Sequence, residues 1–318
     1  MGTYIVKRLA QALLVVIIVT AILFLAMRLL PGDPIRIYIQ EQDYLSLTPE
    51  REAALRAEFG LDKPLPLQYI EWMSNLFRGD FGISIHYRES VATLFADRIP
   101  VTLHLGTLAF IIGNILGVLF GLIAALRRGT WIDTTVTSLA NIGIAAPNFW
   151  LSVLAIYLFG LKLGWLPIFG YTSPLEDLWL STSQLVMPVA VLASFTVAFI
   201  ARQTRSSILE VSRQDYVRTA WSKGLQERVI VLRHMLKNGI IPIVTVMGVG
   251  LANLVGGSMI IENVFAIPGM GRLLVFSVFG QDYQVVQGAV LIVSVLVVMV
   301  NLCVDILYGW LDPRIRYD

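Results

Sequence analysis

The sequence predicts an all-α membrane protein with six spans, and three observations lead to that fold class. Of its 318 residues, 56% are apolar and only 14% are charged, whereas a soluble domain carries about 25% charged residues. The charges are spread unevenly and leave six long stretches free of Asp, Glu, Lys and Arg. Lys and Arg also gather in alternate segments between those stretches, as they do on the cytoplasmic side of membrane proteins.

Each uncharged stretch is long enough to cross the hydrocarbon of a bilayer, which takes about 20 residues. Unpaired backbone groups are not tolerated in lipid, so each stretch is predicted to be helical. Six such runs in one chain disfavour the alternative of buried helices in a large soluble protein. The stretches are 9–27, 99–126, 134–161, 178–201, 238–261 and 283–304.

The first stretch resembles a signal peptide only in part. Lys7 and Arg8 precede it, but its apolar core exceeds the roughly 7–15 residues of a signal, and the apolar pattern continues to Pro31. We therefore expect a retained membrane anchor.

Orientation follows from the basic residues of the short loops. The segments on one side hold many Lys and Arg, whereas the two short loops opposite hold only Lys162 and Arg272. Both termini are therefore predicted to be cytoplasmic. The segment 28–98 is long enough to be translocated regardless of its charge, and it is predicted to lie outside.

This topology divides the chain into three parts. Residues 1–30 form the cytoplasmic N-terminus and the first span, and residues 31–98 form an extracytoplasmic segment. Residues 99–318 form a core of five spans, which includes a cytoplasmic loop at 202–237.

The outer segment is predicted to contain two short helices that lie on the bundle. Thr48 would cap the first, with Pro49 at its first position and Gly60 at its end. The second would be amphipathic. Its expected apolar face comprises Leu67, Ile70, Met73, Leu76 and Phe77.

The second span carries small residues at intervals of four, namely Gly113, Gly117 and Gly121. This spacing allows two membrane helices to approach closely. The glycines could form a contact between two subunits or at a hinge, or they could allow tight packing inside one bundle. The sequence leaves both interpretations open.

The loop 202–237 is the most informative segment. Ser212 and Asp215 fit a helix-start signal, which predicts a short helix over 215–223 that ends at Gly224. Its Val217, Ala220 and Trp221 would share one face. A second amphipathic run, 229–236, follows. Such a helix could dock a soluble partner, which we favour, or rest on anionic lipid headgroups.

The sequence of this loop resembles a known family. "DYVRTAWSKG" (215–224) and "LRHMLKNGIIPIVT" (232–245) are similar to the cytoplasmic signature of permease subunits of binding-protein-dependent ABC importers. The similarity is greatest to the dipeptide, oligopeptide, glutathione and nickel branch. It covers essentially the whole chain, because "FGLDKPLPLQY" (59–69), "IENVFAIPGMGRLL" (261–274) and "DPRIRY" (312–317) also match.

The resemblance implies a six-span type I ABC importer permease fold, in a bacterial or archaeal cytoplasmic membrane. It also implies a second, distinct permease as partner, two ATP-binding subunits that hold ATP and Mg, an extracytoplasmic substrate-binding protein and membrane lipid. A coupling helix would contact one ATP-binding subunit. By motif match it comprises Asp215, Tyr216, Val217, Arg218, Thr219, Ala220, Trp221, Ser222, Lys223, Gly224 and Leu225.

In this family the permeases move cargo by alternating access between inward-open and outward-open states. The branch implies small peptides or glutathione-like cargo, with nickel or a metal chelate as the alternative. The chain departs from the usual pattern at Trp221 and Ser222, and this departure leaves open which ATP-binding subunit fits. An ion-coupled secondary transporter is a distant alternative, because no acid lies within the spans until Glu262 and Asp305 near their edges.

The residues predict a transport subunit that binds no cofactor and no nucleic acid. The sequence lacks the G-x-x-x-x-G-K-[ST] phosphate cradle, and a net charge of +2 gives no basic footprint for nucleic acid. No convergent nucleophile or metal set is evident, which disfavours an intramembrane enzyme. The single Cys303, and His86, His104 and His234 in separate segments, predict no metal site.

Two further sets of residues are candidates for contact with cargo or partners. Polar residues within or at the edge of spans could line a translocation path or form hydrogen bonds between helices; these are Asn114, Asn141, Asn253, Glu262 and Asn301. Residues 268–271 are predicted to form a tight turn in the last outer loop. The candidate outer-loop contacts are Pro268, Gly269, Gly271, Arg272 and Asp282.

Overall fold

The computed structural model describes residues 2–29, 35, 49–58 and 60–311. Within these residues the regular structure is helical, apart from an isolated antiparallel bridge between Ile83 and Ser90. The chain divides into two compact units. Unit 1 comprises residues 1–102, 268–299 and 317–318, and unit 2 comprises residues 103–267 and 300–316.

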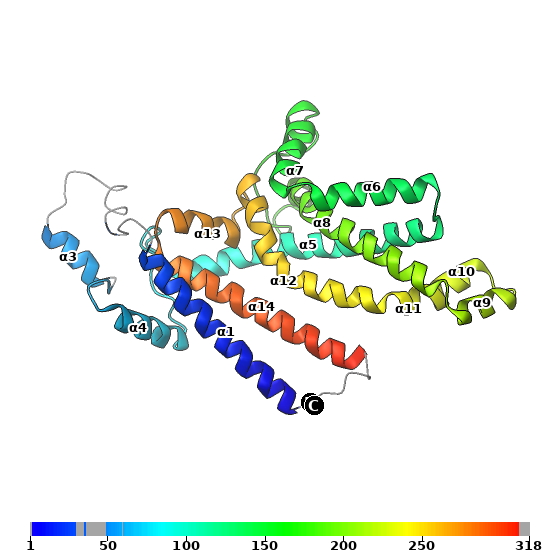
Figure 1. Ribbon diagram of the computed structural model, residues 1–318. Helices are drawn as coiled ribbons and strands as arrows, with labels where there is room; N and C mark the ends of the chain where they lie inside the picture. The colour runs from blue at the N-terminus through cyan, green and yellow to red at the C-terminus, as the bar shows by residue number, and fades with distance from the viewer. Residues whose placement is uncertain (1, 30–34, 36–48, 59, 312–318) are drawn as a thin grey trace. The chain divides into compact units, whose positions relative to one another are not determined.

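Unit 1 contains α1, α3, α4, α13 and parts of two long helices, α5 and α14, which continue into unit 2 (Figure 1). The bounds are α1 Gly2–Leu29, α3 Pro49–Glu58, α4 Leu65–Phe77, α5 Val91–Leu126, α13 Met270–Phe279 and α14 Tyr283–Leu311.

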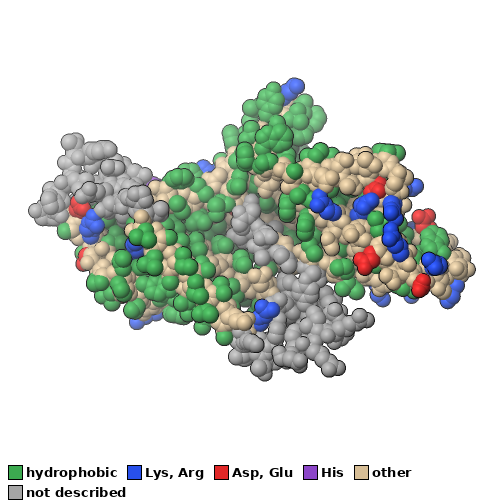
Figure 2. All heavy atoms as spheres, viewed as in Figure 1, with side chains coloured by type: hydrophobic (Ala, Val, Ile, Leu, Met, Phe, Trp, Pro, Cys, Tyr) green, Lys and Arg blue, Asp and Glu red, His purple; other side chains and the backbone are tan. Residues whose placement is uncertain are grey.

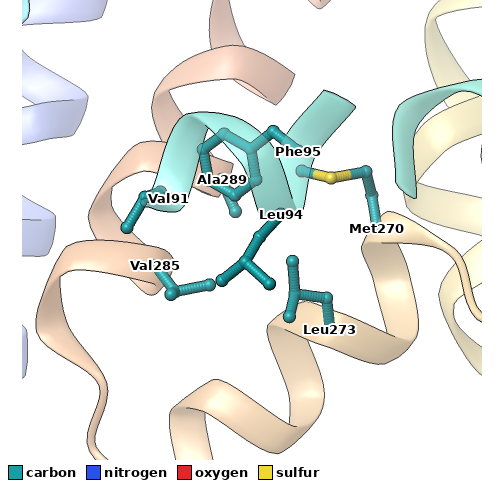
Figure 3. Packing of buried hydrophobic residues seen from close by; sticks show 7 residues of the cluster. All are labelled: Val91, Leu94, Phe95, Met270, Leu273, Val285 and Ala289. Atoms are coloured by element: carbon teal, nitrogen blue, oxygen red, sulfur yellow. The ribbon is translucent and has the colours of Figure 1, made fainter. Parts of the chain in front are cut away.

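The core of unit 1 joins three helices that are distant in the sequence. Figure 3 shows Leu94 and Phe95 of α5 beside Leu273 of α13 and Val285 of α14. All are almost fully buried. Because Gly288 has no side chain, the Phe95 ring packs directly on α14, where an added Cβ would lie 2.9 Å from that ring.

A buried carboxylate fastens the loop before α14. Asp282 is fully buried, and its Oδ2 accepts a hydrogen bond from Ser84 Oγ at 2.5 Å and another from the backbone N–H of His86 at 3.1 Å. The Ser84 hydroxyl also accepts from the backbone N–H of Tyr87 at 2.8 Å. These bonds join the outer segment to the last outer loop, two segments that the sequence places on the same side of the membrane.

The predicted helices of the outer segment are present, but the packed face of the second was predicted wrongly. Helix α3 begins at Pro49 as expected and ends just before Gly60, whose φ is +64°; Thr48 lies outside the described residues. In α4, Ile70 and Phe77 are 61% and 82% exposed, whereas Gln68 and Trp72 are buried.

The reason for this difference lies on α1. The ring of Phe24 stacks with that of Trp72 at a centroid distance of 6.5 Å and meets the edge of the Tyr69 ring at 5.3 Å. The guanidinium of Arg28 donates to Gln68 Oε1. A polar neighbour therefore buries a glutamine, which hydrophobic periodicity cannot anticipate.

The tight turn predicted at 268–271 was also misplaced. Gly269 is the N-cap of α13, so Met270 and Gly271 form the first turn of a helix. The turn lies earlier, at Phe265 and Ala266, where Ala266 has a φ of +53°. The backbone N–H of Met270 donates to Thr102 Oγ1 at 2.8 Å, which satisfies a group at the helix start.

Unit 2 is arranged around α8, Leu178–Val211, which packs against α6, α7, α11 and α12 (Figure 1). The other elements are α6 Trp131–Ala145, α7 Asn148–Ala155, the π-helix η1 Ile156–Lys162, α9 Asp215–Ser222, α10 Glu227–Val229, the π-helix η2 Ile230–Leu236, α11 Lys237–Gly239 and α12 Ile241–Val264.

Among the described residues, four continuous helices are long and apolar enough to cross a membrane, and two bent pairs raise this to six if each pair is one span. The stretch 134–161 was predicted as one helix but breaks into 131–145 and 148–162 with a bend of 107°. Pro147 explains the break, since proline disfavours helical backbone at the residue before it. The second pair bends by 45° near Pro242.

The glycines of α5 pack against α8 within unit 2. An added Cβ would lie 2.9 Å from Thr196 Cβ at Gly113, and 2.7 Å from Ile200 Cβ at Gly117. Of the two interpretations left open by the sequence, the structure shows close packing inside one chain.

An ion pair joins α6 to α8. Arg205 donates to the two carboxylate oxygens of Asp133 at 2.6 and 2.9 Å, and Asp133 also accepts from the backbone N–H of Gly129 at 3.0 Å. The loop predicted at 202–237 is shorter than expected, because α8 continues to Val211 and includes Arg202 and Arg205. The pair joins two segments predicted to be cytoplasmic.

We predict that Gly117→Ala lowers the melting temperature of the purified protein. The added Cβ must displace the branched Ile200, and overpacking of this kind costs about 1–3 kcal/mol. The matched control is Gly250→Ala in α12, where an added Cβ meets no described atom within 4 Å. This control should be neutral or stabilising by up to about 1 kcal/mol. Equal melting temperatures for the two variants would contradict the packing.

We also predict strong coupling between Asp133 and Arg205 in a double-mutant cycle. Asp133→Asn and Arg205→Met should each cost about 1–3 kcal/mol, and the double variant should cost less than their sum. Thermal unfolding in detergent measures this. The exposed pair Lys63–Glu71 is the control, and it should couple more weakly because both side chains are about 40% exposed. Additive effects at 133 and 205 would refute the expectation.

Candidate functional site

Helix α9 is held firmly by its inner face. Val217 and Ala220 are 1% and 4% exposed. They pack into a cluster with Ile208 of α8 and with residues of α5 and η2. The remaining buried members of this cluster are Ala125, Ile230, Val231 and Met235.

The outer face of α9 is presented to the surroundings. The side chains of Trp221 and Tyr216 are 51% and 42% exposed, and Leu225, just beyond the helix, is 38% exposed. Of the three residues expected to share one face, Val217 and Ala220 are buried and Trp221 is half exposed. The cluster is closed by the smaller residues, and the indole lies at its edge. Figure 2 shows Lys and Arg side chains gathered over the end of unit 2 that carries α9 and α10.

The two ends of α9 differ in how they are closed. The predicted start signal is absent, because the Ser212 hydroxyl donates to Leu209 O at the end of α8 and the N-cap residue, Gln214, makes no side-chain cap. The C-terminal end is closed as predicted. Gly224 has a φ of +73°, its N–H donates to Trp221 O, and the N–H of Leu225 donates to Ala220 O, which is the Schellman pattern.

The segment after α9 ties the site to α8. The amide of Asn238 donates to the Tyr216 hydroxyl at 3.0 Å, and the Ser207 hydroxyl donates to Gly239 O at 2.7 Å. The predicted run 229–236 is helical, and most of it has π-helical winding. Together these contacts make α9 a rigid projection of α8 rather than a flexible loop.

Three of the polar candidates within the spans form hydrogen bonds with neighbouring residues. Asn114 is buried and donates to Phe110 O in its own helix, and Asn141 accepts from Arg202 at 2.6 Å. Glu262 is fully buried and accepts from the Ser258 hydroxyl at 2.9 Å. Asn301 is exposed, and the side chain of Asn253 lies outside the described part.

The outer-loop candidates divide into two groups. Pro268, Gly269 and Arg272 line a cavity of about 340 Å³ in unit 1. Gly271 and Asp282 are buried, and the carboxylate of Asp282 is engaged by Ser84 and His86 as described above.

The cavity contains two residues that the sequence analysis missed. Arg98 donates to Pro268 O at 3.3 Å, and Tyr87 lies beside it, where burial raises the pKa of its hydroxyl. Arg98 is the last charge before the second uncharged stretch, and this position could have identified it as a residue of the outer boundary.

The histidines lie in separate surroundings. His104 and the Tyr171 hydroxyl are hydrogen-bonded at 3.0 Å. Within the described part of the chain, His, Cys, Asp and Glu form no group of three that could hold a metal ion.

Comparison with known proteins places the chain in a family. Residues 117–317 match the family described as "Binding-protein-dependent transport system inner membrane component", and residues 1–106 match its N-terminal region. A permease protein ascribed to a peptide transport system in Brucella abortus is 44% identical over the full length of both chains. The di/tripeptide transport system permease protein DppB of Pseudomonas aeruginosa is 38% identical, also over both full lengths.

Two solved structures share the fold. A chain of the MetNI methionine ABC transporter in inward-facing conformations gives a TM-score of 0.57 at 20% identity, over 70% of this chain and 97% of that one. A chain of an amino acid ABC transporter with histidines gives 0.53 at 18% identity, over 69% and 94%. Together with the family matches, these results show that the chain belongs to the binding-protein-dependent transport system inner membrane components, which are multi-pass transport subunits and not catalytic ones.

Proposed function

We propose that this chain is the permease subunit of an ATP-driven importer that moves small peptides into the cytoplasm by alternating access. The observation that carries this proposal is the architecture of α9 in a member of this family. Its small residues, Val217 and Ala220, are buried, while Trp221 is held out at the surface. An exposed aromatic on a rigid base is the usual form of an interface anchor.

The segment 215–225 acts as the coupling helix. An ATP-binding subunit grips the exposed side of α9, and ATP and Mg are bound there, not on this chain. Force applied at Trp221 reaches α8 because the buried side of α9 packs on Ile208 and because Ser207 and Asn238 tie the following segment down. Helix α8 has 34 residues, so it extends about 50 Å and can carry this movement across the bilayer.

The topology that accompanies this function is a six-span type I permease core, in a bacterial or archaeal cytoplasmic membrane with both termini in the cytoplasm. Residues 1–30, 31–98 and 99–318 form the first span, an ordered extracytoplasmic segment and the core. The contacts support this arrangement. Asp133–Arg205 joins two cytoplasmic segments, Asp282–Ser84 joins two outer ones, and the backbone N–H of Gly170 donates to Phe265 O between two outer loops.

The partners follow from this arrangement. A second, distinct permease completes the passage, and two ATP-binding subunits lie beneath the pair. A substrate-binding protein docks outside, where Pro268 and Arg272 line the cavity beside Tyr87 and Arg98. The passage is lined in part by Asn114, Asn141, Asn253, Glu262 and Asn301.

The choice of cargo rests on the relatives, which are named for peptide and di/tripeptide transport. Peptides share a backbone and differ in side chains, so a wet passage with few charged groups suits them. The second candidate is the same machinery carrying nickel or a metal chelate, which the family branch also includes.

Trp221→Asp should uncouple the transporter while leaving the chain folded. The indole is half exposed, so its loss costs little packing, but an interface tryptophan contributes about 2 kcal/mol or more to binding. We expect loss of the ATP-binding subunits on purification and loss of ATP-driven uptake.

The matched control is Trp165→Asp, which changes a tryptophan that is 69% exposed in the predicted outer loop. This control should assemble normally. Normal assembly and uptake in Trp221→Asp would refute the coupling assignment and favour a helix that rests on lipid headgroups.

The cargo can be tested by uptake into proteoliposomes that contain the chain with its native partners. Labelled dipeptide added outside with the substrate-binding protein should accumulate only when ATP is enclosed in the lumen, and a nickel chelate should neither accumulate nor compete. Accumulation of the chelate alone would replace peptide with the metal alternative. Uptake driven by an ion gradient without ATP would overturn the proposed energy source.

A further inference from the structure

Unit 1 contains a cavity of about 440 Å³ that no part of the proposed transport mechanism uses. It is lined by residues of α1, α4 and α14 and by the loop before α5. Four of the lining residues carry the argument below, namely Arg28, Gln68, Trp72 and Gln287.

Three of the residues that line this cavity carry a buried hydrogen-bond donor. Arg28 Nη1, Trp72 Nε1 and Gln287 Nε2 are buried and have no hydrogen-bond partner among the described residues. The Trp72 and Gln287 side chains are only 7% and 1% exposed. A buried donor without an acceptor costs about 1–3 kcal/mol, so three around one cavity call for a ligand with acceptor oxygens.

The cation among them is already positioned. Arg28 Nε and Nη2 both donate to Gln68 Oε1, at 3.2 and 2.9 Å, and the Gln68 amide in turn donates to Lys63 O at 2.7 Å. The guanidinium carbon lies 3.9 Å from the centroid of the Phe24 ring and 4.7 Å from that of the Tyr283 ring. Two bonds and two rings thus fix the guanidinium and leave Nη1 for a ligand.

The place of Arg28 in the sequence identifies the source of the oxygens. It is the penultimate residue of the apolar span 8–29, so it lies at the level of the lipid headgroups. The adjoining turns of α1 expose Ile22, Leu25 and Leu29, which are 63%, 51% and 82% exposed. Acyl chains can lie along these side chains while the phosphate of the same lipid reaches the cavity.

The charges at the cavity suit a zwitterionic headgroup. Glu71 and Asp80 also line it, and Glu71 forms an exposed ion pair with Lys63 at 2.7 Å. Carboxylates beside a guanidinium disfavour a free anion and favour a headgroup that carries an amine next to its phosphate.

We infer that this cavity binds the phosphate of an outer-leaflet phospholipid such as phosphatidylethanolamine, with Arg28, Trp72 and Gln287 as donors. The lipid joins α1, α4 and α14, and so links the first span to the outer segment. The site shares no lining residue with the cavity at Tyr87 and Arg98.

The test is a titration of the delipidated full-length chain, purified with its partners, with dihexanoyl phosphatidylethanolamine. Thermal shift and calorimetry measure binding. Trp72→Phe keeps the ring and removes only its donor, so it should weaken binding about threefold to tenfold. Arg28→Met should weaken it tenfold or more, and Gln287→Leu should act like Trp72→Phe. The control Trp165→Phe, far from the cavity in sequence and in unit 2, should bind as the wild type does.

Two further probes separate the sources of the ligand. Dihexanoylglycerol, which lacks the phosphate, should bind at least tenfold more weakly, and inorganic phosphate should neither bind nor compete. Equal affinity for dihexanoylglycerol would reduce the site to an acyl-chain surface, and binding of inorganic phosphate would make it a free-anion site. If Arg28→Met fails to fold, Trp72→Phe still decides. Unchanged affinity in that variant overturns the proposal.

Discussion

The close approach of α5 to α8 is the constraint on which unit 2 depends. At Gly113, Gly117 and Gly121 the two helices lie so near that a single added carbon would overlap a neighbour on α8. In lipid there is little hydrophobic gain in bringing helices together, so dispersion between closely fitted surfaces must do this work. Helix α8 is thereby held on one side by α5 and joined to α6 by the ion pair of Asp133 and Arg205.

Polar groups specify the ends of the helices where apolar packing cannot. Asp282 gathers Ser84 and the backbone of His86, Thr102 meets the first N–H of α13, and Asp133 receives Arg205 and the N–H of Gly129. Asp282 and Asp133 are buried carboxylates that each accept from more than one donor, and hydrogen bonds to an ionised acceptor are stronger than neutral ones. Apolar surfaces set which helices meet, and these bonds set their register.

Much of this could be predicted from the sequence, because absence of charge and helix-stop residues are local properties. The six uncharged stretches, the start of α3 at Pro49 and the end of α9 at Gly224 all follow from the local effect of the residues at those positions. The errors arose where a distant residue decides. Gln68 is buried because Arg28 comes to it from α1. Ser212 is a different kind of error, since its hydroxyl bonds locally to Leu209 O and closes α8 rather than opening α9.

The break at Pro147 shows a different limit. The proline predicts a disruption, but its size of 107° depends on how α6 and α7 each pack on α8, which no local pattern contains. The cavities of unit 1 were missed for the same reason. Arg28, Trp72 and Gln287 lie in three different helices, and their spacing in the sequence does not predict that they line one cavity.

The division of labour within α9 has a consequence for how such a chain can change over time. The residues that anchor the helix, Val217 and Ala220, are small, aliphatic and buried, whereas the exposed Trp221 contributes little to the packing of the interior. Substitutions at Trp221 can therefore accumulate without loss of folding. Under the proposed function, the choice of ATP-binding subunit can then change over time while the fold stays the same.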